Sequence, residues 1–213
     1  MASGGTSALK RDPYKVLGVP PIAGKDDIRK AYRELAKQYH PDLNPHQPVL
    51  AQERMKELTE AYDLVSNPDA RKEYDGQPQF QLRIPRDFDR ASRGGDGRKS
   101  DSSLWKKLRG VFGKSSDRSG GVSVERELFA DCFSTGVSCF QFAGGKMMPQ
   151  AEQDFARALE ARPDSLESLY NLALVQYRLG KFDQAMLNFK NVLKKVPADP
   201  GSRRMVDALQ GWD

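Results

Sequence analysis

The sequence predicts an all-α protein in which two helical domains are joined by a charged linker. Apolar side chains recur at helical spacing over residues 26–39 and 55–65, and the chain resembles itself at a period of 34 residues in its C-terminal part. Between these regions, residues 76–121 are rich in Gly, Ser and Arg and hold too few apolar residues to bury a core. We therefore expect domains at 12–75 and 122–213, with a flexible linker at 76–121.

The first domain contains a helical hairpin. The helix over 26–39 has one apolar face and an adjacent basic face. It must end near His40, because Pro41 lacks a backbone N–H and its ring clashes with the preceding turn. A second amphipathic helix follows and ends before Pro68. Two helices of this length joined by a short loop pack antiparallel.

Several segments of this domain, in this order and spacing, resemble the J domain of the DnaJ family. They are Asp12-Pro-Tyr-Lys-Val-Leu-Gly-Val19, Ile28-Arg-Lys-Ala-Tyr-Arg-Glu-Leu-Ala36, Tyr39-His-Pro-Asp42 and Ala61-Tyr-Asp-Leu-Val-Ser66. The resemblance implies docking on a DnaK-type (Hsp70) chaperone and stimulation of its ATP hydrolysis. It assigns stimulation to the loop residues His40, Pro41 and Asp42. It assigns electrostatic docking to the basic face of the preceding helix, which comprises Arg29, Lys30, Arg33 and Lys37.

The linker carries the chain's excess positive charge. The whole chain has a formal charge of +5, and residues 76–121 alone hold 11 Lys+Arg against 5 Asp+Glu. The charge therefore says nothing about the partner of either domain. Residues 103–113 form a short basic amphipathic segment for which three interpretations remain: docking on the second domain, weak contact with an anionic membrane surface, or no function. Nucleic acid is not expected as a partner, because aromatic residues for base stacking are sparse there.

The second domain resembles tetratricopeptide (TPR) repeats. Residues 34 apart match in type, as in Ala151 and Ala185 or Phe155 and Phe189, and this period is typical of a helix-turn-helix solenoid. We expect repeats at 132–165 and 166–199. Asp199-Pro200 then caps a closing helix at 200–210.

A TPR-like domain is expected to bind its ligand along a concave groove. The residues of the first helix of each repeat that do not pack inward are mostly apolar and aromatic, which favours an apolar or amphipathic segment as ligand. In the alternative interpretation, these residues are covered within the fold. The predicted groove residues are Phe133, Val137, Phe140, Tyr170, Asn171, Leu174, Tyr177 and Arg178.

The residues indicate neither an enzyme nor a metal protein. No nucleophile-base pair stands out, two His and two Cys are too few for a zinc cage, and no cofactor is expected. Cys132 and Cys139 are interpreted as packed core thiols. The longest uncharged stretch, residues 132–145, is shorter than the roughly 18–20 apolar residues of a membrane span. Without an export signal, a cytoplasmic location is expected.

Two functions follow from these observations. In the first, the chain is a co-chaperone whose J domain stimulates a DnaK-type ATPase and whose TPR-like domain recruits a client protein. In the second, it is an interaction scaffold or assembly factor in which the TPR-like domain provides the main activity and the J domain is vestigial. An ATPase assay separates the two, because only the first requires stimulation.

Overall fold

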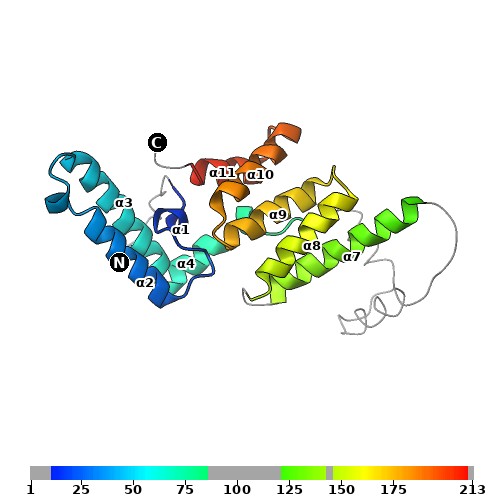
Figure 1. Cartoon of the computed structure of the whole chain (residues 1–213), viewed down its shortest axis with the longest axis horizontal. Helices are drawn as coiled ribbons and strands as arrows, with labels where there is room; N and C mark the ends of the chain where they lie inside the picture. Colours follow the sequence, from blue (N-terminus) through cyan, green and yellow to red (C-terminus); the bar gives the residue numbers. More distant parts are fainter. Residues whose placement is uncertain (1–10, 86–120, 143–145, 211–213) are drawn as a thin grey trace.

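The computed structural model describes residues 11–85, 121–142 and 146–210, and every regular element within these ranges is a helix. The prediction of an all-α protein is confirmed for these residues. Two groups of helices lie side by side along the long axis of the molecule, with α1–α4 in one group and α7–α11 in the other (Figure 1). No helix in the described part of the chain is long and apolar enough to cross a membrane.

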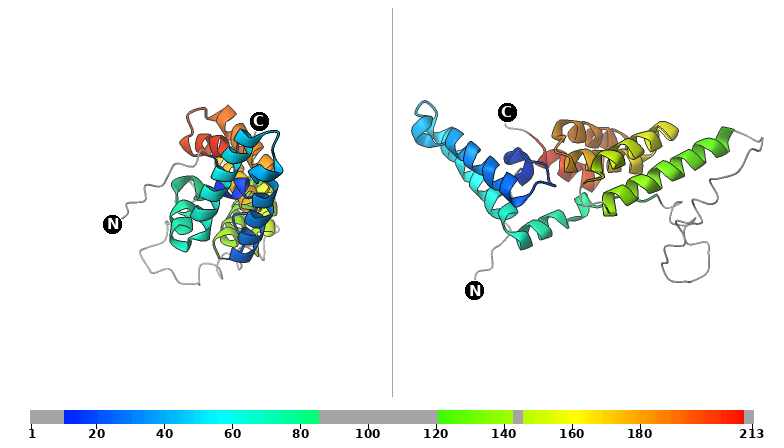
Figure 2. Two further views of the ribbon diagram at one scale, coloured as in Figure 1. Left: turned by 90° about the vertical axis from the view of Figure 1, so that its left-hand side faces the viewer. Right: turned by 60° about the horizontal axis from the view of Figure 1, so that its bottom comes forward.

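The N-terminal group is built around the predicted hairpin. Helix α1 spans Pro13–Val16, α2 Lys25–Gln38, α3 Pro48–Ser66 and α4 Pro68–Asp75. The facing sides of α2 and α3 supply Ile28 and Leu58 to the core, and the rings of Tyr32 and Tyr62 stack with centroids 4.3 Å apart. The hairpin extends away from the other group, so that its closed end is remote from α7 (Figure 2, right).

The C-terminal group is a row of helices in which each packs on the next. Helix α7 spans Gly121–Phe142, α8 Met148–Ala161, α9 Leu166–Arg178, α10 Phe182–Lys195 and α11 Pro200–Ala208. Helices α8 and α10 begin 34 residues apart, as do α9 and α11. The predicted cap at Asp199 is present, because its carboxylate accepts a hydrogen bond from the Ser202 N–H at 2.7 Å.

Residues 76–85, which we call the strap, connect the two groups directly. The strap contains a short 3-10 helix, Pro78–Phe80, and the Phe80 ring stacks on Tyr177 of α9 with centroids 5.3 Å apart and packs on Tyr74 of α4 at 5.2 Å. This differs from the prediction, which placed the start of a flexible linker at residue 76. The rest of that linker, with the amphipathic segment at 103–113, lies outside the described residues.

A buried carboxylate joins the same two groups. The side chain of Asp12 caps α1 and accepts hydrogen bonds from Tyr74 at 2.8 Å and Tyr177 at 2.7 Å, while its backbone N–H donates to the Ala208 carbonyl at 2.9 Å. Burial raises the pKa of the Asp12 carboxyl, whereas the two tyrosine hydroxyls favour its ionised form. Side chains from both groups also share one apolar core. The two predicted domains therefore form a single packed body.

Two glycines with positive φ allow the contribution of the contact between the two helix groups to stability to be measured. Gly180 has φ +76°, and an alanine Cβ there would lie 3.1 Å from Pro20 Cβ of the other group; Gly18 has φ +64° with nothing within 4 Å. We expect Gly18→Ala to cost about 1 kcal/mol of unfolding free energy for the left-handed backbone alone, and Gly180→Ala to cost about 1 kcal/mol more. Urea unfolding of both variants tests this. Equal losses would show that the Pro20 contact does not resist a side chain.

Candidate functional site

The His40-Pro41-Asp42 loop is held by short-range hydrogen bonds that leave the acid exposed. Helix α2 ends at Gln38, and the 3-10 helix Pro41–Leu43 follows. The His40 Nδ1 atom accepts a hydrogen bond from the Asp42 N–H at 3.2 Å, which places the ring proton on Nε2. The side-chain amide of Asn44 donates to the carbonyls of Gln38 at 2.8 Å and His40 at 2.9 Å. Sequence reasoning missed Asn44, although an Asn shortly after a helix stop is a common turn residue.

Asp42 is presented to solvent from this loop. Its side chain is 85% exposed, and its carboxylate lies 3.5 Å from His40 Nδ1. Leu43, the next residue in sequence, is 69% exposed, so an apolar side chain adjoins the acid. Behind the loop, a shallow hollow is lined by Pro41 and residues of α3. The loop thus combines an exposed carboxylate with an exposed apolar side chain, an arrangement suited to docking on a protein surface.

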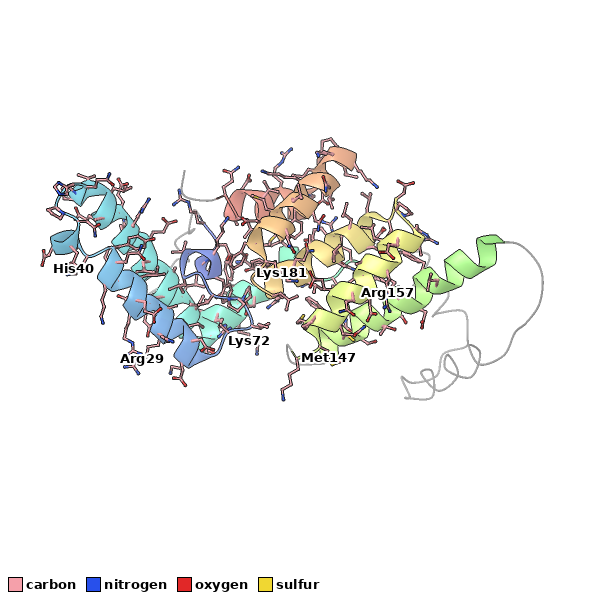
Figure 3. All side chains as sticks on the ribbon, viewed as in Figure 1. Arg29, His40, Lys72, Met147, Arg157 and Lys181 are labelled. Atoms are coloured by element: carbon pink, nitrogen blue, oxygen red, sulfur yellow. The ribbon has the colours of Figure 1, made fainter. Side chains whose placement is uncertain are left out.

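The predicted basic face lies on α2 and is exposed in the described part of the chain. The side chains of Arg29, Lys30, Arg33 and Lys37 are all exposed. None of them forms an ion pair with another described residue. Arg29 points away from the body near the start of α2, and His40 lies near the closed end of the hairpin (Figure 3). The closed end of the hairpin, with the loop, points away from α7–α11 (Figure 3).

The predicted groove of the C-terminal helices is not an open surface. Phe133 points between α7 and α8, where it packs on Phe129 and Phe155 with centroids 5.6 and 5.5 Å apart. The side chains of four α9 residues are buried, and those of three residues at the ends of α7 and α9 are half-buried. The strap and the N-terminal group cover the α9 residues. This agrees with the alternative interpretation, in which the groove residues are covered within the fold. The buried four are Tyr170, Asn171, Leu174 and Tyr177; the half-buried three are Val137, Phe140 and Arg178.

The strap contacts this face through polar groups as well as through Phe80. The Asn171 side chain accepts a hydrogen bond from the Arg83 N–H at 2.8 Å and donates one to the Arg83 carbonyl at 2.8 Å. The Tyr170 hydroxyl donates to the Gln79 carbonyl at 2.7 Å. The Arg83 guanidinium lies 2.8 Å from the Asp199 carboxylate and 3.5 Å above the Tyr170 ring. Sequence reasoning placed Arg83 in the linker and missed this set of contacts.

Asp199 is held in its ionised form by its contact with Arg83. Burial acts to raise the pKa of Asp199, but hydrogen bonds from Arg83 and Ser202 outweigh it and hold that pKa below its usual range. Asp199 is therefore an ionised carboxylate at neutral pH, paired with a guanidinium across a distance of 116 residues in sequence. The pair lies at the start of α11, next to the α9 face that the strap covers.

The two cysteines have no reactive surroundings. Cys132 and Cys139 are buried between α7 and α8, and burial raises the pKa of both thiols. Within the described ranges, no cluster of three or more His, Cys, Asp or Glu residues could hold a metal ion.

Comparison with known proteins identifies the N-terminal group. Residues 12–75 match the family model of the DnaJ domain. The chain is similar to "Chaperone protein DnaJ" of Thermoplasma volcanium (49% identity over 67 residues), of Caldicellulosiruptor saccharolyticus (52% over 68) and of Chlorobium limicola (55% over 67). Each match covers 32% of this chain and 16–18% of the relative, so the chain matches less than a fifth of the length of these relatives. No solved structure matches. The predicted J domain at residues 12–75 is confirmed.

Proposed function

We propose that this chain, with a J domain at residues 12–75, is a co-chaperone that docks on a DnaK-type chaperone and stimulates its ATP hydrolysis. The observation that carries the proposal is the placement of the exposed Asp42 carboxylate on the same hairpin as a basic face that forms no ion pair with the described residues. The loop lies at the closed end of the hairpin, which points away from the C-terminal helices, and the four basic side chains are exposed. Packing of the J domain on those helices therefore leaves its docking surface open.

In this proposal, the loop and α2 contribute to docking through two different physical effects. A carboxylate on a preformed loop pairs with a partner arginine through charge-assisted hydrogen bonds, which are stronger than neutral ones. The four basic side chains of α2 attract an acidic partner surface and speed the encounter, an effect that falls with salt. The chain binds no nucleotide in this proposal, since the ATP belongs to the partner.

The direct test is the steady-state ATPase rate of a DnaK-type chaperone with the purified full-length chain. We expect the double variant Lys30→Glu, Arg33→Glu to raise the half-maximal concentration for stimulation about tenfold or more at low salt, because it reverses two charges of the docking face. The difference should shrink as the salt concentration rises. A matched control is Lys190→Glu, Lys194→Glu on exposed positions of α10, which makes the same change in net charge. Equal behaviour of the two double variants would argue against docking through α2.

For the C-terminal helices we propose a TPR-like unit that recruits a client protein. The equal 34-residue spacing of α8 to α10 and of α9 to α11 supports this, as does the tight turn at Gly180. The small Ala173 and Ala185 have no exposed surface, which agrees with close helix approach in such repeats. If the ATPase assay gives no stimulation, the scaffold function is favoured, in which these helices act without the partner chaperone.

A further inference from the structure

The face of α9 that the strap covers is built to hold an extended peptide. Asn171 has no exposed surface, and both hydrogen bonds of its side-chain amide go to the backbone of Arg83. Such a pair of bonds recognises the N–H and C=O of one residue in an extended chain, whatever its side chain. A buried amide left without partners costs about 1–3 kcal/mol. Removal of the extended segment would therefore leave the Asn171 amide without these two partners.

A separate pocket holds the arginine side chain. The Asp199 carboxylate binds the guanidinium of Arg83, and the Tyr170 ring lies beneath its plane. Gly201 leaves the space that the guanidinium needs, since an alanine Cβ there would lie 2.8 Å from Arg83 Nη2 and 2.9 Å from the Tyr170 hydroxyl. The pocket thus recognises a planar cation, and the neighbouring α9 face recognises the backbone that carries it.

The polar contacts of Arg83 are made with other residues than the contacts that hold the J domain. The Phe80 ring and the hydrogen bond of Tyr177 to Asp12 lie at the J-domain side of α9, whereas Arg83 meets Asn171 and Asp199. Ile84, which follows Arg83, is 47% exposed. Leu82 packs against both apolar clusters and Pro85 is buried, so release of residues 82–85 would break these contacts together with the polar contacts of Arg83.

We infer that this site binds an extended partner segment carrying an arginine preceded by an apolar residue, and that Leu82-Arg83 of the strap is its internal competitor. The inference rests on the client-recruiting half of the proposed function and names the ligand class of that half. The strap is tethered beside the site, so its effective concentration is in the millimolar range for a short linker. A free peptide with an apolar residue followed by arginine binds the unmodified chain weakly. It binds more tightly to a chain in which the strap has lost contacts with this site.

The probe for the test is a labelled peptide with the sequence of residues 79–85, and its binding to the full-length chain is followed by fluorescence anisotropy. We expect Arg83→Ala to increase the affinity for this peptide at least tenfold, because the internal competitor loses its ion pair. Asp199→Asn, added to Arg83→Ala, keeps the helix cap but should lower the affinity at least tenfold. A control variant, Arg157→Ala, changes an exposed arginine on α8 and should behave as the unmodified chain (Figure 3).

A second peptide and a measurement on the unmodified chain keep the inference testable even if a variant fails to fold. The same peptide with alanine in place of its arginine should not bind the Arg83→Ala chain. In the unmodified chain, millimolar probe peptide should speed hydrogen exchange at the Arg83 amide, which Asn171 protects. Three results would overturn the inference. They are failure of the peptide to bind the Arg83→Ala chain, equally tight binding after Asp199→Asn is added, and unchanged hydrogen exchange at the Arg83 amide when the peptide is present. These outcomes are separate from the ATPase assay, which reports on the J domain alone.

Discussion

Asp42→Asn is expected to reduce stimulation of a DnaK-type ATPase to the background rate while leaving the chain folded. The substitution removes one charge and keeps the size of the side chain, so a pairing with a partner arginine in a desolvated contact loses about 2–5 kcal/mol, or roughly 30-fold or more in affinity. The side chain of Asp42 is 85% exposed, and its carboxylate lies 3.5 Å from His40 Nδ1. The loop hydrogen bond to His40 uses the backbone N–H of Asp42 and is retained.

Urea unfolding and the ATPase rate, measured on the same preparation, separate loss of function from loss of fold. The free energy of unfolding should change by less than about 0.5 kcal/mol, as for other exposed positions. Asp63→Asn is a matched control, because it neutralises an exposed acid on α3 outside the loop. If the Asp42 variant stimulates as well as the Asp63 variant, the loop does not act through its carboxylate.

Phe80→Ala is expected to cause the largest loss of stability in the strap. The ring is only 4% exposed and lies between Tyr74 of the J domain and Tyr177 of α9, so its removal leaves a cavity at the junction. Truncation of a buried phenylalanine to alanine costs about 3–5 kcal/mol. Ile84→Ala, in the same strap but half exposed, should cost less than about 1 kcal/mol.

Hydrogen exchange identifies which parts of the molecule weaken with Phe80. If the J domain and the C-terminal helices unfold together, amides of α4 and α9 should lose protection to a similar degree in the variant. Urea unfolding should remain a single transition with a lower midpoint. Loss of protection in only one of the two helices would mean that the junction does not couple them.

Local signals made the J domain predictable. Pro41 determines the end of α2, and the alternation of apolar and basic residues on α2 determines which side packs and which side is exposed. The 34-residue period similarly indicated the spacing of α8 and α10, because repeats of one helical pair repeat their helix boundaries. In each case the information lies within a few turns of helix or in a direct comparison of two segments of sequence.

The junction was not predictable, because its contacts join residues far apart in sequence. Asp12 and Tyr177 are 165 residues apart, and Arg83 and Asn171 are 88 apart. Residues 76–85 contain three Gln, one Gly and two Pro, and they resemble a linker in composition. The alternation of Phe80, Leu82 and Ile84 was a signal of extended structure. It does not say which surface the strap would meet.

The contact of the strap with α9 sets the distance between the Asp42 loop and the C-terminal helices. A tether between independent domains sets how often they meet, and its length controls that frequency. Here the strap and α7 both pack on the same body as the J domain. The distance from the Asp42 loop to the C-terminal helices is therefore a dimension of the fold, set by packing and not by the length of a tether.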